Sequence, residues 1–304
     1  TEPGCCPQPF FSPDGKLVQF IDRPDPEGPP GVYGVPVTGG PATLIGSRVG
    51  LPSPDGRYLA YRNADGQTIV EDTLLRQEWV IPNEGQFVFF SPGSAHLAWA
   101  ETVPAGGFDE RRTVISISNI DGSDPQEIAT VYGGGIAGWL NDDHLLLVGK
   151  ENLGEEQVAL FWLSMLDGSR RELVRNQRIR GIQPSPGGRW VLYAITFDDD
   201  RPENNGMWVV SAEGDLAYKL EVVGSARWRD EDRLIVIPME LDAPSHRLWQ
   251  FNAETGAVSA LTNPDILPFR VAGADWNVAP TGDYVVFVDA ENHAIWVIGL
   301  PPES

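Results

Sequence analysis

Few side chains in this sequence have the types and the spacing that metal binding requires. The run DDD at residues 198–200 is followed by Glu203 and Asn204, and carboxylate and amide oxygens are ligands that calcium accepts. The spacing departs from the calcium-loop pattern D-x-[DN]-x-[DN]-G, because Pro202 and Glu203 occupy the wrong positions. We therefore interpret this stretch as a solvated loop, and the sequence predicts no metal site and no cofactor.

Catalytic signals are equally sparse. His96 and His144 follow short turns, whereas His246 and His293 precede later apolar stretches, so a three-histidine metal site is not expected. In so acidic a chain, no serine, histidine and aspartate set and no carboxylate pair stands out. The sequence names no catalytic residue, and it favours a protein that is not an enzyme while leaving that question open.

A repeated pattern provides the elements that must position all these residues. A Ser-Pro turn followed by an alternating apolar run first occurs as FFSPDGKLVQF at residues 10–20. In this turn Pro presets the first turn dihedral angle, and Gly supplies the left-handed residue that closes the hairpin. The other copies are LPSPDGRYLAY at 51–61, a turn at Ser91, GWLNDDHLLLV at 138–148, QPSPGGRWVLYA at 183–194, RWRDEDRLIVI at 227–237 and NVAPTGDYVVFV at 277–288. Copies roughly 40 to 50 residues apart are typical of propeller blades.

Each of the first six copies is followed by two further apolar strands around a Gly or Asp turn, as in GMWVVSAEGDLAYKL at residues 206–220. Four antiparallel strands per repeat, with no helical period, predict an all-β β-propeller of seven four-stranded blades in a single domain, residues 1–304. Aromatic residues on alternating strand positions, such as Trp99 and Trp296, are expected to fill the space between blades. The predicted units are residues 9–48, 49–86, 87–134, 135–180, 181–223, 224–272 and 273–300.

The last unit is irregular, because it stops after its third strand, HAIWVIGL. Either the last blade is three-stranded or the N-terminal residues close it, although the prolines in TEPGCCPQP disfavour a strand there.

Composition restricts the classes of partner. The chain has 304 residues with 43 acidic and 22 basic side chains, a net charge of -21, which disfavours nucleic acid as a partner. No apolar run is long enough to insert into a membrane. Cys5 and Cys6 are adjacent and cannot join distant segments, and their role stays open. The start at Thr1 suggests a removed export signal or anchor, so we expect a periplasmic or extracellular protein of the bacterial cell envelope.

The FSPDG turn with its following apolar strand and Gly hairpin resembles the WD40-like repeat of TolB and of the dipeptidyl peptidase IV propeller domain. The resemblance covers about residues 9–300 and implies the fold. It implies no site residues, because this chain lacks the G-x-S-x-G elbow of the hydrolases, the N-terminal α/β domain of TolB and the WD dipeptide.

The connections that follow the second and fourth strands are long and varied, and they share one face of a propeller, where binding residues concentrate. We expect an exposed apolar partner-binding patch there. Its predicted members are Phe108, Leu153, Leu241 and Phe269.

Polar residues that precede the first strand of several units are expected to ring an axial opening on the same face. These predicted ligand-binding residues are Arg48, Gln86, Arg180, Arg270 and Asp275. Such a ring suits a small anionic or sugar ligand.

The favoured function is therefore a non-catalytic scaffold that binds a protein or peptide through its long-loop face. The first alternative is binding or sensing of a small ligand, glycan or anion in the axial funnel. The second is an enzyme, such as a lyase, lactonase or glycosidase, with its site in that funnel.

Overall fold

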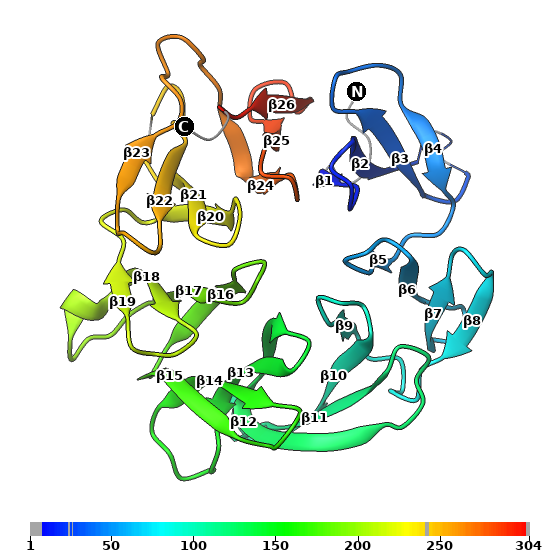
Figure 1. Cartoon of the computed structure of the whole chain (residues 1–304), viewed down its shortest axis with the longest axis vertical. Coiled ribbons are helices and arrows are strands. Elements are labelled where there is room, and N and C mark those ends of the chain that lie inside the picture. Colours follow the sequence, from blue (N-terminus) through cyan, green and yellow to red (C-terminus); the bar gives the residue numbers. More distant parts are fainter. Residues whose placement is uncertain (1–7, 24, 26, 241–242, 302–304) are drawn as a thin grey trace. The chain divides into compact units, whose positions relative to one another are not determined.

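The computed structural model describes residues 8–23, 25, 27–240 and 243–301. These residues form 26 β-strands and two short 3-10 helices, η1 (Phe108–Glu110) and η2 (Pro202–Asn204), so the predicted all-β class is confirmed (Figure 1). Cys5, Cys6 and Leu241 lie outside the described residues.

The chain divides into two compact units, each of which consists of antiparallel sheets. Unit 1 is formed by Thr1–Val49 and Val222–Ser304, and unit 2 by Gly50–Glu221. The single domain and the boundaries of the repeat units stay predictions.

Unit 1 contains three sheets in which consecutive strands are neighbours. The first has β1 (Phe10–Phe11), β2 (Leu17–Asp22), β3 (Gly31–Pro36) and β4 (Thr43–Gly46). The second has β20 (Gly224–Trp228), β21 (Arg233–Pro238), β22 (Trp249–Asn252) and β23 (Val258–Ala260). The third has only β24 (Val271–Val278), β25 (Tyr284–Asp289) and β26 (Ile295–Gly299).

Unit 2 also contains three sheets. One has β5 (Leu51–Pro52), β6 (Tyr58–Arg62), β7 (Thr68–Asp72) and β8 (Gln77–Val80). Another has β16 (Ile179–Pro184), β17 (Trp190–Ile195), β18 (Gly206–Ser211) and β19 (Ala217–Lys219). The largest has β9 (Val88–Phe90), β10 (His96–Val103), β11 (Arg112–Asn119), β12 (Gln126–Asn141), β13 (His144–Lys150), β14 (Val158–Ser164) and β15 (Arg170–Asn176).

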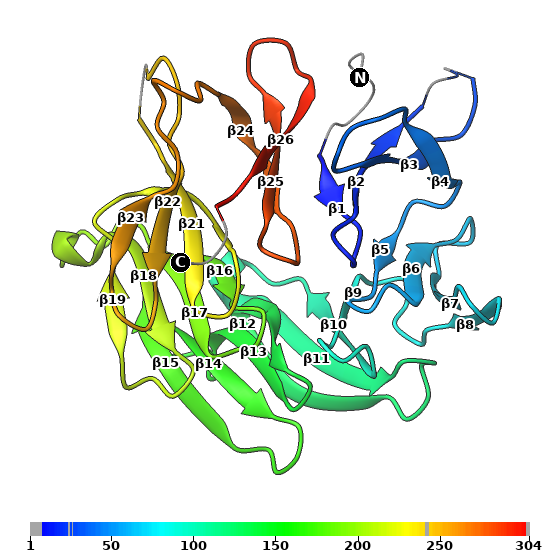
Figure 2. The same ribbon diagram turned by 45° about the horizontal axis from the view of Figure 1, so that its top comes forward.

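The prediction of seven four-stranded blades is wrong. The described strands form five sheets of blade size, four with four strands and one with three, together with one continuous seven-stranded sheet (Figure 2). The physical reason is β12, a strand of 16 residues that pairs with β11 in its first half and with β13 in its second. Two repeat units therefore meet in one continuous strand, and register shifts around Gly133–Gly135 allow this strand to pair with both β11 and β13.

The repeated turn is held by hydrogen bonds between residues that are close together in the sequence. Ser53 Oγ donates a hydrogen bond to Asp55 Oδ1 (2.6 Å) and accepts one from the Tyr58 N–H (2.9 Å). Gly56 takes the predicted left-handed conformation, with φ +74°. In the turn that Ser91 opens, Ser94 occupies this left-handed position instead, with φ +58°.

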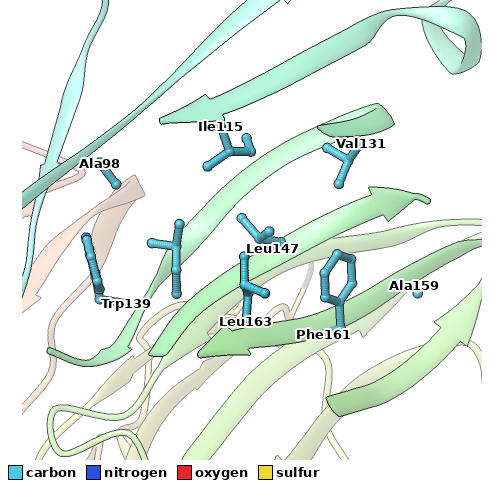
Figure 3. Packing of buried hydrophobic residues seen from close by; sticks show 9 residues of the cluster. Ala98, Ile115, Val131, Trp139, Leu147, Ala159, Phe161 and Leu163 are labelled. Atoms are coloured by element: carbon cyan, nitrogen blue, oxygen red, sulfur yellow. The ribbon is translucent and has the colours of Figure 1, made fainter. Parts of the chain in front are cut away.

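Apolar side chains pack between the strands within each unit. In the seven-stranded sheet of unit 2, Ile115, Leu145 and Leu147 are fully buried in one cluster, which also contains Trp139 (Figure 3). Trp139 Nε1 donates to the carbonyl oxygen of Phe89 (3.1 Å), so the indole is both buried and hydrogen-bonded. Trp99 is buried as predicted, but Trp296 is 54% exposed, which contradicts its predicted place in the core.

Candidate functional site

Three long connections of unit 2 are joined to one another through side-chain contacts at the ends of neighbouring strands. They are the segments 104–111 after β10, 151–157 after β13 and 196–205 after β17. We call them the loop cluster of unit 2. Each follows the second strand of its repeat unit, as the sequence predicted for the long connections.

The first loop is fixed by a lysine and a glycine. Asp109 Oδ2 lies 3.7 Å from Nζ of Lys150, the last residue of β13, whose aliphatic stem is buried. A Cβ atom on Gly133 would lie 3.0 Å from the Cα of Asp109, so only glycine lets the loop approach β12 this closely. Segment 104–111 is therefore held directly beside the start of segment 151–157.

The second loop is fixed by an ion-pair network. Arg175 Nη1 on β15 lies 2.8 Å from Glu155 Oε2, and its Nη2 lies 2.6 Å from Glu172 Oε2. Asn152 Nδ2 donates to the other oxygen of Glu155 (2.8 Å). The Arg175 guanidinium, and then Asn152, lower the pKa of Glu155, while the two carboxylates raise the pKa of Arg175.

The third loop is fixed by a buried aspartate. Asp198 Oδ2 accepts hydrogen bonds from Nδ2 of Asn176, the residue after Arg175, and from Nδ2 of Asn204, both at 2.9 Å. These donors, Asn176 first, lower the pKa of Asp198. The solvated loop predicted from DDD is therefore wrong for Asp198, which is buried, and holds for Asp199 and Asp200, which are exposed.

The fixed loops present apolar side chains to solvent. Phe108 is 62% exposed and the Arg111 guanidinium lies 5.4 Å from its ring centroid. Phe197 is 69% exposed, and the Arg178 guanidinium lies 5.5 Å from its ring. Phe197 also has φ +56°, a left-handed conformation that bulky residues rarely adopt and that the surrounding hydrogen bonds must maintain. Leu153, whose position in the sequence lies between Phe108 and Phe197, is also exposed.

The predicted partner-binding residues that the structure describes differ in their exposure. Phe108 and Leu153 are exposed, as expected for an apolar patch, whereas Leu241 lies outside the described residues. Phe269 is only 6% exposed, which corrects its predicted place on the surface. Its ring lies 5.4 Å from that of Phe287 in the core of unit 1, and the His246 N–H donates a 2.7 Å hydrogen bond to the Phe269 carbonyl oxygen, which holds the segment there. Sequence reasoning missed Phe197, although an aromatic residue directly before three aspartates is a signal of exposure.

The predicted ligand-binding residues are divided between the two units, so their common ring stays a prediction. Arg48 and Arg270 in unit 1 and Gln86 and Arg180 in unit 2 have exposed side chains, and Asp275 is half-buried. Gln86 has a structural role through its backbone. Its carbonyl oxygen accepts hydrogen bonds from Thr68 Oγ1 and Asn83 Nδ2, both at 2.7 Å.

Among the described residues, no three or more His, Cys, Asp and Glu side chains come together in a way that could hold a metal ion. No helix in the described part of the chain is long and apolar enough to cross a membrane.

The chain matches no protein-family model and no curated protein. Among solved structures, it is similar to the β-propeller domain of the Trilobed protease from Pyrococcus furiosus, with a TM-score of 0.64, 13% identity and coverage of 99% of this chain and 96% of that one. It is also similar to an oligogalacturonate lyase in complex with manganese, with a TM-score of 0.64, 14% identity and coverage of 97% and 88%.

A third similar structure is dipeptidyl peptidase 4 from Porphyromonas gingivalis, with a TM-score of 0.56, 12% identity and coverage of 89% of this chain and 46% of that one. Similarity at these identities shows the fold alone. The chain thus has a β-propeller fold.

Proposed function

We propose that this protein is a non-catalytic propeller scaffold that binds a protein or peptide partner through the loop cluster of unit 2. The two exposed Phe–Arg contacts, Phe108 with Arg111 and Phe197 with Arg178, support this proposal most strongly. Aromatic and arginine side chains are enriched where the binding energy of protein interfaces concentrates. An arginine that already rests on an aromatic ring also loses less conformational freedom on binding.

The anchoring of the loops is the second support. Lys150, Arg175 and Asn176 fix one loop each, so the exposed apolar side chains are carried on a preorganised frame. Exposed carboxylates follow Phe197 at Asp199 and Asp200. The partner that fits is one with an apolar centre and basic residues around it.

Photo-crosslinking in cells tests this function. A photo-crosslinking amino acid in place of Leu153 is expected to give an adduct of discrete mass, which disappears when Phe108→Ser and Phe197→Ser are added. The matched control carries the crosslinker at Leu166, which is 76% exposed in the turn between β14 and β15, outside the loop cluster. The proposal fails if the Leu153 position gives no adduct, or if the Leu166 position gives the same adduct.

The alternatives from the sequence stay predictions: a small anionic, sugar or glycan ligand, and a lyase, lactonase or glycosidase activity. A thermal-shift screen against sugars, anions and divalent metals separates them from partner binding, because a ligand of the native state raises the melting temperature. A bacterial, periplasmic or extracellular location also stays a prediction, which cell fractionation checks.

A further inference from the structure

The last sheet of unit 1 lacks a fourth strand in the described part of the chain. Its order is β24-β25-β26, and β26 pairs only with β25 (Figure 1). Two flanking hydrogen bonds, Asp289 N–H to Ala294 O (2.9 Å) and Leu300 N–H to Asp283 O (2.7 Å), fix which backbone groups of β26 face outward. Because inward and outward groups alternate along an antiparallel strand, the N–H and C=O groups of Ile295, Val297 and Gly299 point away from β25.

A groove of about 400 Å³ lies beside this edge, within unit 1. Val18 and Phe20 of β2 line one side, and Ile295, Trp296 and Val297 of β26 line the other. Trp296 is the large aromatic residue whose exposure contradicts its predicted place in the core.

The fourth strand of one sheet in unit 2 shows what this groove lacks. In unit 2, Ile81, just after β8, lies in one buried cluster with Phe90, Leu97 and Trp99 of the following sheet, and Trp79 of β8 packs against this cluster. The end of this fourth strand thus fills space between its own sheet and the next one.

The residues after β26 are held elsewhere. Leu300 packs against the cluster that contains Trp276 and Phe287, and the carbonyl oxygen of Pro301 accepts a 2.8 Å hydrogen bond from Arg229 Nη2. Neither residue lines the groove.

We propose that β26 binds an extended peptide of a partner protein, which adds as the fourth strand of this sheet. Main-chain hydrogen bonds to Ile295, Val297 and Gly299 would hold the peptide, and apolar side chains on alternate residues would enter the groove. The peptide has basic residues at both ends, because the hairpin carries Asp283 at one end and Asp289 and Glu291 at the other. This edge belongs to unit 1, whereas the loop cluster belongs to unit 2.

The test measures fluorescence anisotropy of a labelled peptide, Arg-Val-Thr-Val-Thr-Val-Arg. We expect saturable binding to the wild type and binding at least about tenfold weaker when both Arg residues are replaced by Glu. In the protein, Val297→Pro removes one N–H that points away from β25 and breaks no hydrogen bond between β25 and β26. We expect this variant to bind the peptide at least about tenfold more weakly.

The matched control is Val258→Pro on β23. Asn252 N–H donates to Ala257 O, and Leu261 N–H donates to Leu248 O. Because inward and outward groups alternate, the N–H of Val258 also points outward from this edge strand. This variant is expected to bind the peptide like the wild type. Unchanged binding to a folded Val297→Pro variant, or no saturable binding to the wild type up to about 1 mM, overturns the proposal.

Backbone methylation of the peptide provides a second test, which decides the matter if Val297→Pro does not fold. N-methyl groups on residues 3 and 5, or on residues 2, 4 and 6, block opposite edges of the added strand, so only one of these sets is expected to abolish binding. Equal effects of both sets contradict strand addition. A dimer seen by sedimentation without peptide, and absent in Val297→Pro, also overturns the proposal, because a second copy would then occupy the edge.

Discussion

The buried Arg229 donates a 2.9 Å hydrogen bond from Nε to the carbonyl oxygen of Gly282, in the turn between β24 and β25. Its other two nitrogens donate to Gln250 Oε1 and to the Pro301 carbonyl, both at 2.8 Å. One guanidinium therefore joins the sheet of β20–β23 to the turn of the next sheet within unit 1. The close approach requires glycine, since Gly282 has φ +73° and a Cβ there would lie 3.0 Å from the Arg229 carbonyl oxygen.

Gly282→Ala is accordingly expected to lower the free energy of unfolding by about 1 to 3 kcal/mol, from backbone strain and the close contact together. Gly168→Ala is the matched control, because Gly168 has φ +70° but open space around its Cβ position. Urea unfolding of both variants separates the two effects. Equal losses would show that the contact with Arg229 contributes nothing.

Asn176→Ala is expected to lower the free energy of unfolding by about 1 to 3 kcal/mol, because the buried carboxylate of Asp198 loses a donor. Asn152→Ala serves as the control, since Asn152 is exposed and its loss is expected to lower stability by less than about 0.5 kcal/mol. Limited proteolysis is expected to cut segment 196–205 faster in Asn176→Ala alone. Equal cleavage in both variants would contradict the anchoring role of Asn176.

The pH dependence of stability is expected to report on His246. Burial, and then the charge of Arg270, lower its pKa below 6.5, whereas Glu240 acts in the opposite direction. His246 Nδ1 accepts a 3.1 Å hydrogen bond from the Val271 N–H, which requires the unprotonated nitrogen. The unfolded chain thus binds the proton more readily, so this contribution to stability is complete above about pH 6.5 and is lost as the pH falls below it.

Urea unfolding at several pH values checks this expectation, with His246→Gln as the comparison. The difference in unfolding free energy between the wild type and the variant is expected to shrink as the pH falls. If this difference in unfolding free energy stays constant between neutral and mildly acidic pH, His246 does not make the pH-dependent contribution.

Phe197→Gly is expected to leave the free energy of unfolding within about 1 kcal/mol of the wild-type value, because glycine relieves the left-handed backbone while making the unfolded chain more flexible. The same change is expected to weaken partner binding through the loop cluster. Thermal unfolding and the crosslinking assay measure the two effects on the same variant. A large loss of stability would mean that the ring of Phe197 packs against the fold.

The local features of the fold could be predicted from the sequence, and the non-local ones could not. The turn at Ser53 and the left-handed Gly56 depend on neighbouring residues only, so the repeat predicted them correctly. The glycines at residues 133–135 look like a turn in the sequence, yet pairing with two different strands makes them the middle of β12.

The candidate site shows the same division. Phe197 and Phe269 are both aromatic residues in long connections, and only the packing around them makes the first exposed and the second buried. Asp198 resembles its neighbours Asp199 and Asp200 in the sequence, but Asn176, distant in the chain, removes it from solvent. Contacts between distant segments decide these cases, and no local pattern encodes them.

The shared strand β12 has a consequence for the evolution of the chain. A repeat that keeps all its strands to itself can be duplicated or deleted as a whole without disturbing its neighbours. The two repeats that meet in β12 use different halves of this strand, because residues 126–132 pair with β11 and residues 132–141 pair with β13. A break at Gly133–Gly135 would leave each repeat with its own strand pairing, so the continuous strand does not prevent either repeat from being gained or lost alone.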